Sequence, residues 1–266
     1  MKKTLILIKL GGSLITDKNK AFTAKNDLIL RLAKEIKSSL KNSKADLIIG
    51  HGSGSFGHIV AAKYQTQKGI INKDSISGFS LVADAARKIN VIVMDNLLKV
   101  GLKAVSFSPF SFIYTKDEKK ESFLVKPIKK ALEIGLIPVI YGDVIMDQTK
   151  GFCIYSGEKI LNLLTKRLKD NYSDMKIIYC GQTNGVYDEK GKTIDKITPK
   201  SYSSIKKVLK GSAGVDVTGG MFHKVKEAIE LVTKLNVESL IINAKRKNVL
   251  KYAILGRTVE ATHITQ

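Results

Sequence analysis

Residues 9–18 read Lys-Leu-Gly-Gly-Ser-Leu-Ile-Thr-Asp-Lys and directly follow the apolar run 4–8. Such a run is typical of a buried strand, and a lysine at its end is partly desolvated, so an anionic partner is expected. Two glycines and a serine let the backbone turn sharply and point N–H groups outward, as phosphate-binding loops do. Lys18 adds a second cation on the far side of this loop. An ordinary Gly-Gly turn flanked by solvated lysines fits the same residues. Further glycine loops are therefore needed to distinguish a phosphate-binding loop from such a turn.

The composition indicates a globular protein with an excess of positive charge. The chain has 266 residues, of which 44% are hydrophobic, enough for one large core or two fused lobes. Its 45 Lys and Arg against 24 Asp and Glu give a formal charge of +21, which suits either a nucleic-acid binder or an enzyme with an anionic substrate. The lysines are spread along the whole chain, so solvated faces explain most of them.

The cysteines and the N-terminus favour a cytoplasmic protein. Cys153 and Cys180 have no metal-ligand spacing and are too few for a disulfide scaffold, which fits a reducing compartment. Lys9 interrupts the first apolar run after five residues, too early for a signal peptide, and no run is long enough to span a bilayer. We therefore expect Met1 to begin a soluble protein.

Apolar runs and helical periodicities alternate along the chain, which predicts a mainly parallel α/β sheet covered on both faces. Asp27 is the expected N-cap of the first long helix. Residues 110–125 are expected to form a hairpin or lid, and 144–155 a second hairpin. Expected strands cover 4–8, 45–49, 103–107, 137–141, 175–180, 237–243 and 259–264, and expected helices cover 28–40, 59–64, 78–100, 126–134, 158–169, 203–209 and 221–235.

A second glycine loop follows the second expected strand. Its spacing at Gly52, Gly54 and Gly57 satisfies G-x-G-x-x-G, a weak signal by itself. A Walker site is excluded because His58 and Ile59 stand where that motif needs lysine and a hydroxyl residue. A strand, glycine loop and helix in this order form an anion site at a helix N-terminus. We expect His58, in the first turn of that helix, to bind an anionic acceptor, whereas His51 and His223 are interpreted as packing or surface residues.

A third glycine loop, 216–221, precedes Lys224 on an expected helix. Three lysines beside three glycine loops predict a general anion-binding site. Phosphoryl transfer requires little more, because positioning and electrostatic stabilisation supply most of the catalysis.

Taken together, the motifs resemble the amino acid kinase superfamily and, within it, the isopentenyl phosphate kinases. The resemblance runs through nearly the whole chain and rests on Lys9–Lys18, His51–His58, Pro138–Val144, Ser156-Gly157, Asn184–Tyr187 and Asp216–Lys224.

This resemblance implies a three-layer αβα sandwich with a mainly parallel central sheet, the amino acid kinase-like fold. It implies one domain over 1–266, with an acceptor-binding N-terminal lobe (about 1–155) and an ATP-binding C-terminal lobe (about 156–266). It further implies ATP-dependent conversion of isopentenyl phosphate to the diphosphate by direct in-line transfer, with Mg²⁺ carried by the nucleotide. A cytoplasmic homodimer with no nucleic-acid or membrane partner is expected.

The resemblance also assigns roles to single residues. Lys9 and Lys224 would hold the ATP phosphates, Lys18 would stabilise the transition state, and His58 would bind the acceptor phosphate. The remaining nucleotide-binding residues would be Gly11, Gly12, Ser13, Gly54, Gln182, Gly185, Tyr187 and Gly220. The remaining acceptor-binding residues would be Ser53, Gly54, Gly142, Asp143 and Gly157.

Two positions depart from the family pattern. Glu158 stands where the family usually has an aspartate that orients the lysines. Gln182 and Asn184 replace the two carboxylates usual near the nucleoside, which affects the preference for the base.

A prenyl tail needs an apolar slot, and spacing alone cannot separate its lining from ordinary core. The candidate lining residues are Phe79, Val82, Ala83, Ala86, Met94, Ile145 and Ile154. Two alternatives stay open at this point: a fosfomycin-type phosphonate kinase, which could use the same histidine site, and a basic nucleic-acid-binding α/β protein.

Overall fold

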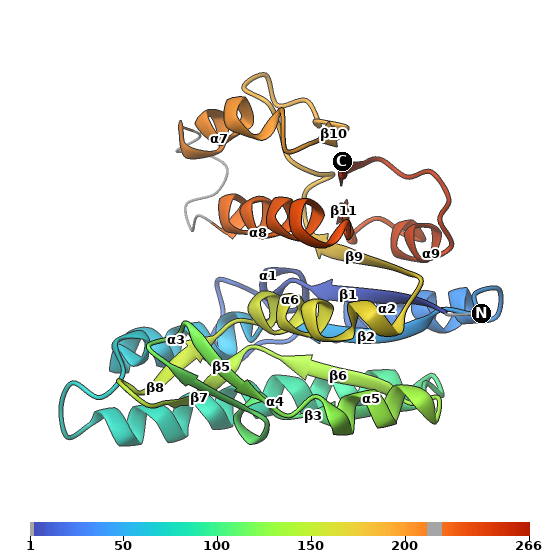
Figure 1. Ribbon diagram of the computed structural model, residues 1–266. Helices are drawn as coiled ribbons and strands as arrows, with labels where there is room; N and C mark the ends of the chain where they lie inside the picture. The colour runs from blue at the N-terminus through green and yellow to red at the C-terminus, as the bar shows by residue number, and fades with distance from the viewer. Residues whose placement is uncertain (1–2, 212–219) are drawn as a thin grey trace.

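The computed structural model describes residues 3–211 and 220–266, and its centre is an eight-stranded sheet. All neighbouring strands are parallel except β11 and β12, as expected for a mainly parallel sheet. The strand order is β10 (Lys196–Ile197), β12 (Ala261–Ile264), β11 (Glu238–Asn243), β9 (Asp174–Gly181), β1 (Thr4–Leu10), β2 (Asp46–His51), β6 (Ile137–Tyr141) and β3 (Ala104–Phe107). The strands of this sheet that Figure 1 labels follow one another down the view in this order.

Helices cover both faces of this sheet and create two cores. Alternate residues of β1 belong to different cores, with Leu5 and Leu7 in one and Ile6 and Ile8 in the other, as the two-residue period of a strand requires. The first core is covered by α5 (Lys126–Glu133), α6 (Gly157–Leu168) and α8 (Gly220–Leu235). The second is covered by α2 (Asn26–Leu40), α4 (Ser75–Lys99) and α9 (Val249–Ile254). The expected three-layer αβα architecture is therefore confirmed.

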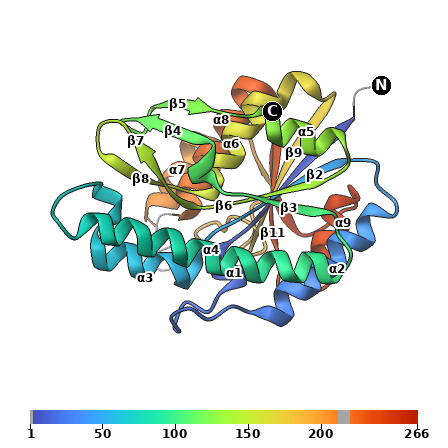
Figure 2. The same cartoon turned by 90° about the horizontal axis from the view of Figure 1, so that it is seen from below.

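A second sheet, which the sequence analysis did not foresee, lies beside α4 (Figure 2). The two expected hairpins form, and they join because β4 pairs in parallel with β7. The four strands in order are β5 (Lys120–Phe123), β4 (Ile113–Lys116), β7 (Asp143–Asp147) and β8 (Gly151–Tyr155). The remaining elements are α1 (Gly12–Ile15), α3 (Gly54–Tyr64), α7 (Tyr202–Gly211) and the 3-10 turns Thr66–Lys68, Pro109–Ser111 and Lys169–Asn171.

Three expected helix starts are wrong, and one of them is that of α4, which begins at Ser75 rather than at residue 78. Helix α2 begins at Asn26 with Lys25 as its N-cap, so Asp27 lies inside the first turn. Helix α3 begins at Gly54 rather than Ile59, because the Ser55 N–H already donates to the Thr16 hydroxyl at 3.0 Å. The Thr16 side chain, from the first glycine loop, thus supplies the capping hydrogen bond at the start of α3.

Residues 212–219, which include positions 216–219 of the third glycine loop, lie outside the described residues, whereas Gly220 and Lys224 are in α8. Within the described ranges, no helix has the length and apolar character needed to cross a membrane. Cys153 and Cys180 are both buried, and both are free cysteines.

Candidate active site

The site lies where the carboxyl ends of the central strands meet. The last residues of the strands are in register, with Leu10 opposite both His51 and Cys180, and His51 opposite Tyr141. The segments that leave β1, β2, β6 and β9 therefore share one edge of the sheet, which is the usual place for ligands in open α/β sheets.

The first two glycine loops touch each other directly at this edge. A Cβ built on Gly12 would lie 2.7 Å from the backbone nitrogen of Gly54, closer than any side chain allows. Gly54 itself has φ +52°, a conformation that glycine adopts without strain. The buried Thr16 hydroxyl joins the loops, because it donates to Gly12 O at 2.8 Å and accepts from Ser55 N–H. The two loops are thus packed directly against each other.

Lys9 is buried beside the second loop: 2% of its surface is exposed, and a Cβ built on Gly52 would lie 3.6 Å from its Nζ. Its Nζ lies 2.7 Å from Glu158 Oε1. Helix α6 begins beside it, with the Ser156 hydroxyl accepting from Lys159 N–H as a true N-cap. Gly157 is needed here, since a Cβ would lie 2.9 Å from Cε of Lys9. Glu158, which stands where the resemblance predicts an aspartate, therefore still forms an ion pair with Lys9.

Positive charges converge around Glu158 and His58. Burial opposes ionisation of Glu158, but the ammonium of Lys9 and its hydrogen bond, together with Lys224, hold the pKa of that carboxyl below its usual range. His58 is exposed on α3, yet nearby protein displaces enough water to lower the pKa of its imidazole. Glu158 opposes this change, whereas the charges of Lys18 and Lys9 add to it. Lys9, Lys18 and Lys224 therefore act on one shared region. His58 lies in the second turn of α3 rather than the first, because the helix begins at Gly54.

Gly142 and Asp143 form another wall of the site, next to His51 and Gly157. Gly142 N–H donates to His51 O at 3.0 Å, and a Cβ on Gly142 would lie 3.0 Å from the nitrogen of Gly157. The Asp143 carboxyl is 4% exposed and accepts from Val144 N–H at 2.8 Å. Burial raises its pKa to about 7, an effect that this hydrogen bond only partly offsets. This part of the site thus holds a carboxyl that keeps its proton to a higher pH than an ordinary aspartate does. Ser53, the N-cap residue of α3, borders the same loop, although its side chain makes no cap hydrogen bond.

The turn after β9 borders the other side of the first glycine loop. Gln182 Nε2 donates to Ser13 O at 2.7 Å, and Gly11 N–H donates to Cys180 O at 3.0 Å. Asn184, in place of the family's carboxylate, donates to Glu260 at 2.8 Å and accepts from Asn243 at 2.9 Å.

Gly185 and Tyr187 lie in this same turn. A Cβ on Gly185 would lie 2.8 Å from the nitrogen of Thr262, so the turn packs closely on β12. The Tyr187 hydroxyl accepts from Asn184 N–H at 3.1 Å. These two residues therefore shape the turn after β9.

The sequence analysis missed a buried polar chain beneath the second loop. His51 is fully buried, stacks on Tyr141 with ring centroids 5.6 Å apart, and contacts Asn90 Oδ1 through Nε2 at 3.1 Å. Asn90 in turn donates to the Ser106 hydroxyl at 2.8 Å. Burial, with a smaller opposing effect from the hydrogen bonds, lowers the pKa of His51 to about 4, so the ring is neutral. A neutral, buried ring agrees with the interpretation of His51 as a packing residue. The sequence signal for this polar chain was Asn90, a polar residue on the largely apolar inner face of α4.

The expected prenyl slot is only partly assembled. Phe79, Val82, Ala83 and Ile154 pack around Val144 between α3, α4 and the small sheet. Met94 and Ile145 belong to the second and first main cores, so the ordinary-core alternative holds for these two residues. Ile145 follows Val144 in a strand, so the two side chains point to opposite faces. Phe79 also contacts Phe110 and Phe152, with ring centroids 5.6 and 5.2 Å apart.

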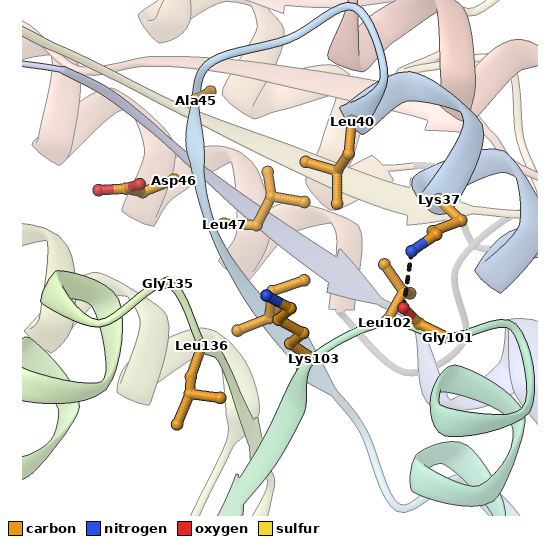
Figure 3. Close-up of a pocket in the computed structure, with 11 residues that line it drawn as sticks. Lys37, Leu40, Ala45, Asp46, Leu47, Gly101, Leu102, Lys103, Gly135 and Leu136 are labelled. Carbon is orange, nitrogen blue, oxygen red and sulfur yellow. Dashed lines mark hydrogen bonds between the residues drawn. The ribbon is translucent and has the colours of Figure 1, made fainter.

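A separate cavity of about 240 Å³ lies at the opposite edge of the sheet (Figure 3). Its walls come from the residues before and at the starts of β2, β3 and β6 and from the end of α2, whose Lys37 donates to Gly101 O at 2.7 Å. Because parallel strands begin at this edge, the cavity is remote from the glycine loops.

Comparison with known proteins agrees with this geometry. The sequence model of the amino acid kinase family matches residues 4–243, and the chain belongs to that family. It is 36% identical to the isopentenyl phosphate kinase of Methanocaldococcus jannaschii and 35% identical to that of Methanothermobacter thermautotrophicus, each over 98% of this chain and 98% or 99% of the relative. A crystal structure of an isopentenyl phosphate kinase superposes with a TM-score of 0.81 at 32% identity, covering 98% of this chain and all of that one.

Proposed function

We propose that this protein is a kinase that transfers the γ-phosphoryl group of ATP to isopentenyl phosphate. An oxygen of the acceptor phosphate attacks the γ-phosphorus in line, the bond to the β–γ bridging oxygen breaks, and isopentenyl diphosphate and ADP leave. The observation that carries the proposal is that two glycine loops contact each other beside the ion pair of the buried Lys9 with Glu158, with His58 on the helix that follows the second loop. The similarity to isopentenyl phosphate kinases over nearly the whole chain supports the choice of acceptor.

On the nucleotide side, we assign the ATP phosphates to Lys9 and Lys224, with the amides of Gly11, Gly12 and Ser13 around the transferred group. The closeness of both lysines to Glu158 supports this, because a carboxylate can hold two ammonium groups in place without bonding to phosphate itself. Lys18 would neutralise the charge that develops on the equatorial oxygens during transfer. Gly54 and Gly220 would complete this side, and the turn with Gln182, Gly185 and Tyr187 would border the nucleoside.

On the acceptor side, we assign the phosphate to Ser53, Gly54 and His58, with Gly142, Asp143 and Gly157 along the wall. A neutral imidazole donates one hydrogen bond to a phosphate oxygen, and the bound dianion then favours the charged ring. The tail would lie toward Phe79, Val82 and Ile154, the apolar cluster beside α3.

Mg²⁺ would arrive with ATP and neutralise charge between its phosphates. Such an ion needs few protein ligands. The division into an acceptor lobe (about 1–155) and an ATP lobe (about 156–266), the homodimer and the cytoplasmic location stay predictions from the family resemblance.

An assay that couples ADP release to a colour change tests the acceptor. Purified protein with ATP and Mg²⁺ is offered isopentenyl phosphate, glutamate, UMP, carbamate and fosfomycin in parallel. We expect the highest kcat/KM with isopentenyl phosphate. Turnover of fosfomycin alone would support the phosphonate kinase, and turnover of an amino acid alone would exclude a phosphate acceptor. Retention of nucleic acid at physiological salt without any kinase activity would favour the nucleic-acid-binding alternative.

A further inference from the structure

Lys18 lies in a solvent-exposed loop between α1 and α2. The loop is closed at its base by the bridge between Thr16 and Ala24 and by Asp17 N–H, which donates to Thr23 O at 2.9 Å. All residues from Lys18 to Phe22 are exposed. Burial alone therefore does not determine where the Lys18 ammonium lies.

Both arms of this loop contact α3. The first arm is fixed by Thr16, whose hydroxyl accepts from Ser55 N–H at 3.0 Å. The second arm carries Phe22, whose ring meets the ring of Phe56 edge to face, with centroids 5.5 Å apart and planes at 78°. Phe56 is 3% exposed, so the second arm rests on a fixed part of the helix.

Phe22 is an unusual residue for this position. Its φ is +49°, a left-handed conformation that bulky side chains rarely adopt, and its side chain is 47% exposed. Asparagine or glycine would fit this backbone with less strain, and a polar residue would suit this exposure. The contact that an aromatic ring provides here, and a smaller residue does not, is the one with Phe56.

Helix α3 also carries His58, two residues after Phe56. We infer that Phe22 is a positioning residue, whose ring packs on Phe56 and fixes the loop that carries Lys18 relative to the helix that carries His58. The inference rests on the proposed function in so far as Lys18 acts on the transferred phosphoryl group. It adds a residue outside the glycine motifs, one that acts only through Lys18.

The kinetic test compares Phe22→Ala with Phe22→Tyr and Phe22→Asn. We expect Phe22→Ala to lower kcat about 10- to 100-fold, since small displacements of a catalytic group have effects of this size. Phe22→Tyr keeps the ring and should retain wild-type kcat. Phe22→Asn relieves the backbone but lacks the ring, so it should resemble Phe22→Ala. Wild-type kcat in Phe22→Asn would overturn the inference.

A double-mutant cycle separates positioning from a general structural effect. In a Lys18→Ala background, Phe22→Ala should lower kcat no further, because the residue through which it acts is gone. An equal loss of kcat in both backgrounds would contradict the proposed role.

An NMR titration of His58 gives a readout that needs no turnover. The charged groups that act on this ring are Glu158, Lys18 and Lys9, and the charge of Lys18 contributes to lowering its pKa. The pKa of His58 should therefore rise in Lys18→Ala, rise similarly in Phe22→Ala, and stay unchanged in Phe22→Tyr. An unchanged His58 pKa in Phe22→Ala, with the expected rise in Lys18→Ala, would refute the inference. Absent kinase activity with the expected titrations would instead refute the proposed function alone.

Discussion

The substitution Asp143→Asn should remove a pH dependence of stability that the buried carboxyl creates. Asp143 is 4% exposed, and the hydrogen bond recorded for its carboxylate comes from the next residue's N–H. Burial raises the pKa of this group from 3.8 to about 7 in the folded protein. Asparagine has nearly the same shape and never ionises, so it serves as a matched neutral reference.

The size and sign of the effect follow from proton linkage. Between about pH 4 and pH 7 the unfolded chain has lost the Asp143 proton while the folded protein retains it, so the free energy of unfolding falls as the pH rises. One pKa unit corresponds to 1.36 kcal/mol, and a difference of about three units gives ~4 kcal/mol as an upper bound. Above the folded pKa the loss is complete. Water or polar groups that rearrange around the carboxylate would reduce this value.

Urea unfolding at pH 5, 6, 7 and 8 measures the effect. The other titrating groups are common to both proteins, so the difference in unfolding free energy between Asp143→Asn and the wild type isolates Asp143. We expect this difference to grow in favour of the variant by ~1 kcal/mol per pH unit up to about pH 7, and then to level off. A difference that is the same at pH 5 and pH 8 would refute the raised pKa and the dry environment deduced for this wall.

Four further substitutions test the site. Lys18→Ala should lower kcat about 100-fold with little change in the KM for isopentenyl phosphate, as steady-state kinetics would reveal. His58→Ala should raise that KM about 10-fold or more through loss of a hydrogen bond to a charged group, and equal kinetics in variant and wild type would argue against a phosphate acceptor. Glu158→Gln should lower the free energy of unfolding by about 3 kcal/mol, because the Lys9 ammonium would stay buried without its counter-charge; an unchanged urea midpoint would contradict the ion pair. Gly12→Ala should abolish activity and destabilise by about 2 kcal/mol, since its Cβ must push the second loop away; a fully active, equally stable variant would disprove the close contact.

Local sequence patterns predicted most of the large sheet, because each strand carries its own signal. The apolar run before Lys9 and the run before His51 identify β1 and β2 without knowledge of their neighbours. The small sheet could not be found in this way. Its assembly depends on the parallel pairing of Tyr114 with Met146, and the choice of such a distant partner is a property of the folded chain rather than of either segment.

The residues of the site likewise divide into those with a local sequence signal and those without one. Lys9 and Gly12 were recognised because glycine loops after strands leave a local signature, whereas Thr16 was not, although it joins two loops. Its hydroxyl caps a helix 39 positions away, and nothing in its own neighbourhood distinguishes it from a surface threonine. The lining of the apolar slot could not be separated from ordinary core by residue type, because Ile145 is as apolar as Val144 but points to the opposite face of its strand.

The direct contact of Gly12 with Gly54 limits how this protein can change over evolutionary time. Enlarging either residue cannot be rescued by trimming the other, because neither has a side chain to give up. Altered substrate preference must therefore arise elsewhere, in α4 and the small sheet, where neighbouring side chains can exchange volume with one another. Under the proposed function, the loops assigned to phosphate should therefore vary less than the helix and sheet assigned to the carbon chain.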